Sequence, residues 1–289
     1  MPLNEPSCSL PAAAACDEHT WPTTQQTSVL RLDGDTVRAC LDEVVEEVPV
    51  ALVYNGISHA VLLATPSDLE DLALGFSLSE GILASRSELY DSETVARSSG
   101  IEMRMEVAAG RFAALKERRR NLAGRTGCGL CGVESLDALG RPLDPVPAAA
   151  PIPVAAVAAG LTELPDWQQL RRSTGAVHAA AWIGRDGHIR ALREDVGRHN
   201  ALDKLLGHLA RNKVPPGDGF VLVSSRASYE MVQKVAALGI GCLVAVSAPT
   251  ALAIRLAQSA GVSLAGFARD QRMVVYAGEA GFARTIAAR

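Results

Sequence analysis

Residues 220–246 read FVLVSSRASYEMVQKVAALGIGCLVAV, and this stretch decides the fold. The apolar runs at residues 220–223 and 242–246 are short and bounded by polar loops, as buried strands are. Between them, residues 229–238 carry apolar side chains at helical spacing. Because a crossover helix joins parallel strands, this order predicts two parallel strands with a helix packed on one face of their sheet.

The same alternation is expected to continue on both sides of this stretch. Apolar runs and helical spacing predict strands over residues 175–182, 263–267 and 273–276, and helices over residues 201–210 and 250–260. Continuous apolar strands are typical of a sheet that is covered on both faces and largely parallel. We therefore predict an α/β domain over residues 141–289, a layered sheet with helices on both faces.

Residues 28–140 precede this domain and are expected to form a separate part of the fold. Residues 48–63 read as a β-hairpin whose turn is Asn55-Gly56. The sequence Ser67-Asp68-Leu69-Glu70 is typical of a capping box and predicts a helix that ends at Glu80-Gly81. Residues 101–107 alternate apolar and polar side chains, which predicts an exposed strand.

Two further segments lack the periodicity of packed elements. Residues 1–27 are rich in Pro, Ser, Thr and Ala, and we expect a disordered tail there. Residues 141–165 are rich in Pro and Ala, which favours a connection between the two parts of the chain.

Composition excludes several classes of function. The 289 residues carry a net charge of −4 and 4% aromatic residues, so neither a basic excess nor stacking side chains indicate a nucleic-acid partner. Six cysteines are far fewer than a secreted disulfide scaffold would have, which favours a reducing cytoplasm. The sequence contains no uninterrupted apolar run of 18 residues, so we expect no membrane span.

The stretch Gly127-Cys128-Gly129-Leu130-Cys131-Gly132 is the strongest indication of chemistry. Its glycines leave both thiols open, and the basic residues just before it favour the thiolate. A structural zinc site would need a second ligand pair, which the sequence lacks. A zinc deaminase would need a His-x-Glu motif, and none of the six histidines starts one. Disulfide exchange and persulfide transfer both stay open.

Three loops are predicted to meet at the carboxyl edge of the α/β sheet: residues 224–228, 247–250 and 267–272. Two of them lead into helix N-termini, where free N–H groups favour anions. Hydroxyls and arginines at such positions are typical of a phosphate or pyrophosphate site. The side chains we expect to serve there are Ser225, Arg226, Ser247 and Thr250.

A dense run of charge lies at residues 193–204, just before an apolar helical stripe. Asp195, Arg198, His199 and Asp203 fall within about two helical turns. We predict a polar cluster at the start of this helix and include it in the candidate site, without assigning a role to each member.

Five motifs, in order, resemble those of the FdhD/NarQ family, the formate dehydrogenase accessory sulfurtransferases. They are Asp71-Leu72-Ala73-Leu74-Gly75-Phe76 with Ser79-Glu80-Gly81, then GRTGCGLCGVE (124–134), EDVGRHNALDK (194–204), SSRASYEMVQK (224–234) and SAPT (247–250). The resemblance covers residues from about 45 to 277. One departure is Ser225, where many family members have glycine.

The resemblance implies a specific activity. Family members take sulfur as a persulfide from a cysteine desulfurase and deliver it to the molybdenum bis-pyranopterin guanine dinucleotide cofactor, which is then inserted into formate dehydrogenase. By position, Cys128 would carry the persulfide and Cys131 would assist or relay it.

The resemblance also implies a binding segment, a fold and an assembly. The family's cofactor-binding segment falls on Phe267, Ala268, Arg269, Asp270, Gln271 and Arg272, to which we add His199 and the loop residues above. GDP would serve as a fragment of this cofactor. The expected fold is similar to that of cytidine deaminases, with a smaller N-terminal α+β portion, and the expected assembly is a homodimer.

Overall fold

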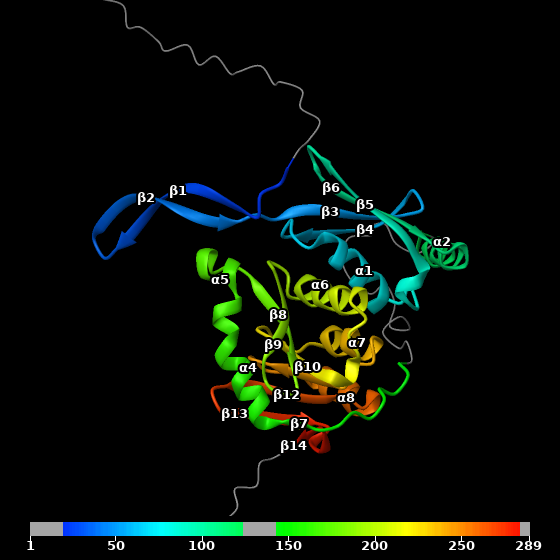
Figure 1. The fold of residues 1–289 in the computed structure, drawn as a ribbon. Helices are drawn as coiled ribbons and strands as arrows, with labels where there is room; N and C mark the ends of the chain where they lie inside the picture. Colours follow the sequence, from blue (N-terminus) through cyan, green and yellow to red (C-terminus); the bar gives the residue numbers. More distant parts are fainter. Residues whose placement is uncertain (1–19, 124–142, 284–289) are drawn as a thin grey trace, which may run out of the picture.

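The computed structural model describes residues 20–123 and 143–283. A small sheet lies at one end of the molecule and a larger α/β domain at the other (Figure 1). Helices α1 (Leu69–Ser79) and α6 (Arg198–Arg211) pack against each other between them. The predicted layered α/β class is confirmed.

The larger domain is built on a six-stranded sheet in the order β13-β12-β11-β10-β8-β9. Its strands are β8 (His178–Gly184), β9 (Ile189–Asp195), β10 (Gly219–Val223), β11 (Cys242–Ala245), β12 (Ser263–Arg269) and β13 (Arg272–Ala277). The central strands β10, β11 and β12 are parallel, whereas the β8–β9, β8–β10 and β12–β13 pairs are antiparallel. The prediction of a largely parallel sheet was therefore wrong at both flanks, where turns too short to hold a helix join neighbouring strands.

Helices cover both faces of this sheet, as predicted. On one face, α6, α7 (Tyr229–Ala237) and α8 (Ala251–Ala260) share a core that includes Leu206 and Val235. On the other face, α4 (Val154–Trp167) packs through Val157 and Leu164.

Helix α4 corrects the expectation of a plain connection over residues 141–165. Its buried stripe consists of Ala156, Val157, Gly160 and Leu164, with Gly160 set against the sheet. A Cβ at Gly160 would lie 2.4 Å from Ile183 Cδ1, so the small side chains let the helix approach the sheet closely. Pro165 lies two residues before the end of the helix, so the hydrogen bond that it removes interrupts only the last turn.

The smaller part is a four-stranded sheet in the order β4-β3-β6-β5, with α1 on its inner face. The strands are β3 (Val48–Tyr54), β4 (Ile57–Ala64), β5 (Leu89–Arg97) and β6 (Gly100–Val107). The predicted hairpin is confirmed, since Asn55 and Gly56 both have positive φ (45° and 81°), as a type I′ turn requires. Strand β6 is not an exposed strand, because the side chains of Ile101, Met103, Met105 and Val107 are buried against α1 and its neighbours.

The start of α1 differs from the capping box that the sequence predicts. Asp68 has a left-handed conformation (φ 50°) and its side chain caps no helix N–H. Its carboxylate instead lies 3.2 Å from the Arg193 guanidinium. The predicted end is confirmed, with Glu80 as the C-cap and Gly81 at φ 61°. The Asp68 side chain thus pairs with Arg193, far away in the sequence, and does not cap the helix.

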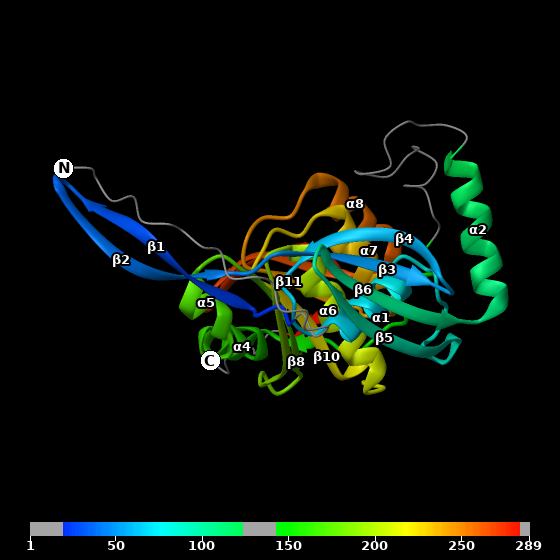
Figure 2. The same cartoon turned by 90° about the horizontal axis from the view of Figure 1, so that it is seen from above.

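Strands β1 (Thr24–Asp33) and β2 (Thr36–Val45) form a two-stranded antiparallel ribbon that the sequence analysis missed. Strand β1 begins inside residues 1–27, so the expected tail ends no later than residue 23. In two perpendicular views the ribbon extends away from the rest of the molecule (Figures 1 and 2). In the sequence, this segment lacks the buried apolar run that marks the other strands.

The remaining elements are α2 (Ala109–Ala123), α5 (Gln169–Thr174) and the short paired strands β7 (Ile152–Pro153) and β14 (Phe282–Ala283). Within residues 20–123 and 143–283, the helices are too short or too polar to cross a membrane.

Candidate functional site

The three predicted loops do lie side by side at the carboxyl edge of the six-stranded sheet. Residues 227 and 249 form a β-bridge, and Thr250 N donates to Ala227 O at 3.0 Å. Phe267 N donates to Ser247 O at 3.1 Å, which attaches the third loop to the second. Hydrogen bonds between main-chain atoms thus hold the three loops as one surface.

Two of the predicted hydroxyl ligands are already used within the fold. Ser225 is buried, and its Oγ donates to Arg226 O at 3.1 Å. Thr250 caps α8, its Oγ1 accepting from Ala253 N at 3.2 Å. Both hydroxyls therefore already have a hydrogen-bond partner within the protein, whereas the Arg226 side chain is exposed at this edge. The N-terminus of α7 is different, because its N-cap residue Ser228 makes no side-chain cap.

Residues 267–272 span the end of β12, the turn at Asp270 and Gln271, and the first residue of β13, and not all of their side chains are accessible to a ligand. Phe267 and Asp270 have positive φ (51° and 54°), and the Phe267 ring is 54% exposed. Ala268 is fully buried, so it cannot offer a side chain to a ligand. A groove of about 1050 Å³ runs along β13 and is lined by Phe267, Gln271 and Arg272 among others. Three of the six predicted residues therefore face one large groove.

His199 joins the first turns of α6 and α7 at the same edge. Its Nε2 lies 2.8 Å from Glu230 Oε2. Burial lowers the pKa of His199, although the Glu230 carboxylate opposes this shift. Because a lowered pKa favours the neutral imidazole at neutral pH, His199 can accept or donate a hydrogen bond there.

His178, which the sequence analysis did not select, begins β8 beside the same edge and pairs with Asp195 in the ladder. Burial lowers its pKa, and the nearby charges of Arg198 and Arg171 lower it further. The only sequence signal was its place at the start of a buried strand, which does not distinguish a functional histidine from a structural one.

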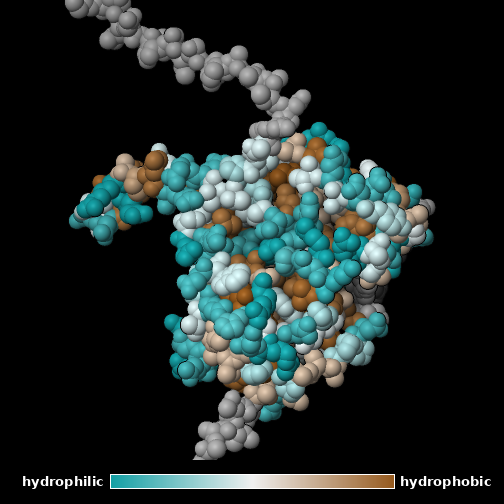
Figure 3. Space-filling view, in the orientation of Figure 1, coloured by the Kyte–Doolittle hydropathy of each residue, from teal (hydrophilic) through white to brown (hydrophobic). Residues whose placement is uncertain are grey.

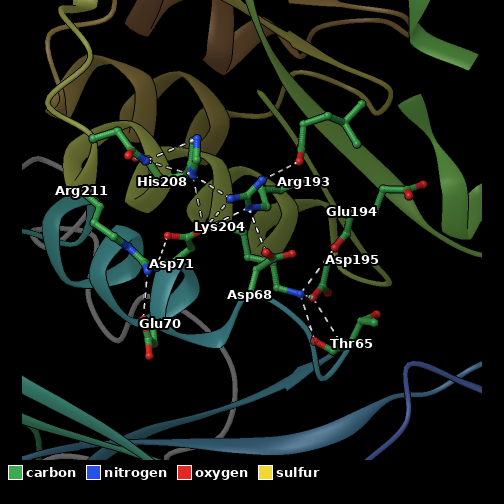
Figure 4. A network of polar contacts seen from close by, with 12 residues as sticks. Thr65, Asp68, Glu70, Asp71, Arg193, Glu194, Asp195, Lys204, His208 and Arg211 are labelled. Carbon is green, nitrogen blue, oxygen red and sulfur yellow. Dashed lines mark hydrogen bonds and ion pairs between the residues drawn. The ribbon is translucent and has the colours of Figure 1, made fainter. Parts of the chain in front are cut away.

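The predicted cluster of Asp195, Arg198, His199 and Asp203 does not form a single group. Asp195 is fully buried and pairs with Lys204, whose Nζ lies 2.7 Å from Asp195 Oδ2 (Figure 4). Lys204 Nζ also donates to Thr65 O at 2.9 Å, and Thr65 N donates to Asp195 Oδ2 at 3.0 Å. Asp195 and Lys204 thus connect the end of β4 to the end of β9 and the middle of α6.

Asp203 belongs to a second buried network, which α6 forms with α7 and the end of α1. Lys234 Nζ, from α7, lies 2.9 Å from Asp203 Oδ2 and 2.8 Å from Glu80 Oε1. Ser79 Oγ donates to Asp203 Oδ1 at 2.7 Å. Burial alone would lower the pKa of Lys234, but the Asp203 and Glu80 carboxylates outweigh it and raise that pKa.

A third group surrounds Asp71 of α1, whose carboxylate is almost fully buried. Arg193 reaches it with Nη2 at 2.8 Å, and Arg211 forms a further ion pair with it (Figure 4). His208 Nδ1 lies 2.7 Å from Arg193 Nη2, and burial lowers the pKa of His208. A neutral His208 can accept that hydrogen bond.

These networks change the interpretation of the charged motifs. They fasten the smaller part of the chain to the larger domain. The smaller part contributes Asp71, Ser79 and Glu80, and the larger domain contributes Arg193, Asp203, Lys204 and Lys234. Their role is to position the two parts, while Arg226, His199 and residues 267–272 stay at the exposed edge. Asp195 and Asp203 were predicted to belong to the site because the sequence does not show which lysines pair with them.

Cys128 and Cys131 lie outside the described residues, and so do Cys8 and Cys16. Among the described residues, Cys40 is partly exposed on the ribbon, and Cys242 is buried in β11. Burial raises the pKa of Cys242 to about 12, so this thiol is inert. No group of three or more metal-ligating side chains occurs in residues 20–123 and 143–283.

Comparison with known proteins identifies the relationship of this chain. The profile of the FdhD/NarQ family matches residues 45–282. The chain belongs to this family. It is 56% identical over 267 residues to the sulfur carrier protein FdhD of Cupriavidus necator, an alignment that covers 92% of each chain. It is also 56% identical over 250 residues to the protein of the same name from Chromobacterium violaceum, covering 85% of this chain and 92% of that one.

A solved structure shares the fold. It is the crystal structure of a candidate formate dehydrogenase accessory protein from Desulfotalea psychrophila, with a TM-score of 0.73. The match covers 91% of this chain and all of that chain at 21% sequence identity. The layered arrangement is therefore kept in a protein whose sequence is only 21% identical.

Proposed function

We propose that this chain is a sulfurtransferase that carries a persulfide on Cys128, assisted by Cys131, from a cysteine desulfurase to the molybdenum bis-pyranopterin guanine dinucleotide cofactor of formate dehydrogenase. The observation that carries the proposal is a Cys-x-x-Cys pair between glycines in a chain 56% identical to proteins named sulfur carriers. Their name favours sulfur carriage over disulfide exchange, the alternative that the residues alone leave open.

The uptake step needs no external oxidant. The Cys128 thiolate attacks the outer sulfur of the desulfurase persulfide, and a new S–S bond forms as the old one breaks. The desulfurase cysteine leaves as a thiolate, so atoms and electrons balance within the two proteins. Arg125 and the basic residues before it would favour the attacking thiolate by charge.

The exposed sheet edge supports the second half of the proposal, the binding of a large anionic cofactor. Arg226, the uncapped start of α7 and the groove along β13 offer positive charge, free N–H groups and space. In this proposal His199 and residues 267–272 bind the guanine dinucleotide part, and the cysteine pair delivers sulfur to the metal end.

Sulfur labelling tests the first half. Incubation with a cysteine desulfurase and ³⁵S-cysteine should place on wild-type protein a label that dithiothreitol removes. Replacing both Cys128 and Cys131 by alanine should abolish this label, because no thiolate remains in the loop. Cys40→Ala is the matched control and should keep the full label, since Cys40 lies in strand β2 and outside the Cys-x-x-Cys motif. An undiminished label on the double variant would refute the persulfide role.

Nucleotide affinity tests the second half. GDP should bind wild-type protein, and Arg226→Ala or Arg272→Ala should weaken it by about tenfold, the effect of losing one charge-assisted contact to phosphate. Isothermal titration calorimetry would measure this. Arg190→Ala removes the same charge near the opposite edge of the sheet, where Arg190 pairs with Asp186, and should leave GDP affinity unchanged. Equal affinity in all four proteins would rule out this edge as the site.

A further inference from the structure

Strand β13 forms one edge of the six-stranded sheet. Within residues 20–123 and 143–283 it pairs only with β12, so the N–H and C=O groups on its other side have no strand to pair with there. A row of such groups is a template on which a strand of another chain can pair. In Figure 1, β13 lies toward the end of the larger domain that is remote from the smaller sheet.

The side chains of β13 do not protect this edge. Between Arg272 and Ala277 the strand reads Met-Val-Val-Tyr, without a charge or a proline. Val274 and Val275 are 47% and 36% exposed, and as neighbours in a strand they point to opposite faces of the sheet. Both lie on regular rungs, since the irregularities in the pairing with β12 fall on either side of them. A strand added to this edge would therefore meet apolar side chains on both faces.

The opposite edge of the same sheet has another character. Strand β9 carries Arg190, Arg193, Glu194 and Asp195 among its seven residues. Charged side chains along an edge are a common means of preventing the pairing of strands from different molecules. The sheet thus has one edge that its own sequence protects and one edge that is open to an extended, apolar segment.

Space for such a segment is present beside β13. The groove of about 1050 Å³ is lined by every residue of this strand, and also by Val154 at the start of α4 and Phe282 of β14. These two apolar side chains give the groove a second wall. Apolar colour is visible at this end of the larger domain in the space-filling view (Figure 3). The groove can therefore take the side chains of a strand whose main chain pairs with β13.

The size and place of this edge indicate which partner it fits. Six residues make an edge about 20 Å long and about 10 Å thick, so pairing buries about 400 Å² in total. That area is too small for a permanent contact with a second copy and belongs to the weak, transient class. Arg272 is both the first residue of β13 and part of the proposed cofactor-binding segment. A partner on β13 would thus lie beside the bound cofactor and could leave again.

We propose that the open edge of β13 docks an extended, apolar segment of the formate dehydrogenase polypeptide that receives the cofactor, and that this segment adds to the sheet as a seventh strand. Main-chain hydrogen bonds would supply the affinity, and the groove would select apolar side chains without proline. The inference rests on the proposed function for the identity of the partner, and on the edge and groove of β13 for the mode of binding.

Hydrogen–deuterium exchange on the full chain locates the docking site. The probe is formate dehydrogenase purified from cells that make no molybdenum cofactor. Its addition should slow amide exchange in residues 272–277 at least ~10-fold, because the outward N–H groups of β13 gain acceptors. Residues 189–195 of β9, the opposite edge, should exchange at an unchanged rate. Unchanged exchange in β13, or equal slowing at both edges, would overturn the proposal.

Matched variants test the edge itself by biolayer interferometry with the same immobilised probe. Val274→Lys should weaken docking at least ~10-fold, because an added strand would bury the new charge. Val61→Lys makes the same change on the edge strand β4, where Val61 is 54% exposed, and should dock as wild type does. Equal affinities for these two variants would overturn the proposal, and so would an assembly of the free chain with itself that only Val274→Lys abolishes.

Two further measurements separate docking from sulfur carriage. Val274→Lys should keep the full ³⁵S label, and the variant with Cys128→Ala and Cys131→Ala should dock as wild type does. Either proposal can then fail without the other. Loss of docking in the cysteine variant would show that the partner is held by the Cys-x-x-Cys loop and would overturn the assignment to β13.

Discussion

Gly75→Ala should cause the largest loss of stability of any single methyl addition in the described chain. Helices α1 and α6 cross with their backbones in contact, and a Cβ at Gly75 would lie 1.8 Å from Asp203 O and 2.7 Å from Gly207 N. Gly207 meets the same limit from the other side, 1.9 Å from Asp71 O. Since backbone atoms cannot turn aside, the helices must separate. We expect a loss above ~3 kcal/mol in the free energy of unfolding, beyond the usual range for overpacking.

Urea denaturation of Gly75→Ala and Gly110→Ala provides the comparison. Gly110 also lies in a helix, α2, but nothing lies within 4 Å of the position its Cβ would take. Gly110→Ala should therefore raise stability slightly, by about 0.5–1 kcal/mol, because alanine favours the helix. Equal unfolding midpoints for the two variants would mean that α1 and α6 do not cross at this distance.

Lys204→Met should produce the second large effect. Lys204 is fully buried, and burial lowers its pKa, opposed by the Asp195 carboxylate. Methionine keeps most of the side-chain volume but leaves Asp195 buried without its cation, which typically costs about 3–5 kcal/mol. Thr65 O would also lose its charged donor. We expect a correspondingly lower unfolding midpoint and a weaker attachment between β4 and α6.

Two variants distinguish a buried-charge effect from a general loss of lysine. Lys213→Met changes an exposed lysine just after α6 and should shift stability by less than about 0.5 kcal/mol. Adding Asp195→Asn to Lys204→Met removes the unpaired charge and should recover part of the loss. A double variant less stable than Lys204→Met would show that Asp195 is stabilised mainly by Thr65, Gly197 and Asn200, its other hydrogen-bond donors.

The apolar pattern predicted the central elements of the fold well, because burial on both faces leaves an unbroken run of apolar residues. Strands β10, β11 and β12 and helices α6, α7 and α8 were all expected near their observed places. Strand direction was harder to predict. Whether a strand such as β8 pairs parallel or antiparallel depends on which strand lies beside it. The residues of β8 alone do not show which strand that is.

Elements whose stability depends on distant contacts were missed or misjudged. Helix α4 has Pro153 just before its first residue and Pro165 in its last turn, so its sequence does not read clearly as a helix. It is stabilised by packing on the sheet. The start of α1 exchanges its expected local cap for Arg193 of β9. In the ribbon, apolar and polar side chains alternate along two exposed strands. This pattern is weaker than the continuous apolar runs of the core strands.

The candidate site divides in the same way. Local sequence predicted the three loops, because each follows a recognisable strand and the ends of parallel strands share an edge. It did not predict that Ser225 would be buried or that Ala268 would turn inward, since both depend on how the neighbouring loop packs. Nor did it reveal His178, which reaches this edge because β8 runs antiparallel to β10.

By itself, the sequence determined the layered α/β class, the meeting of three loops at one edge of the sheet and the glycine-flanked cysteine pair, because periodicity and motif chemistry are local properties. Only the tertiary structure decided which charges stay exposed at that edge and which hold the molecule together. Asp195 and Asp203 look the same in the sequence as functional carboxylates do. Their roles follow from Lys204 and Lys234, which the fold places within 3 Å of them.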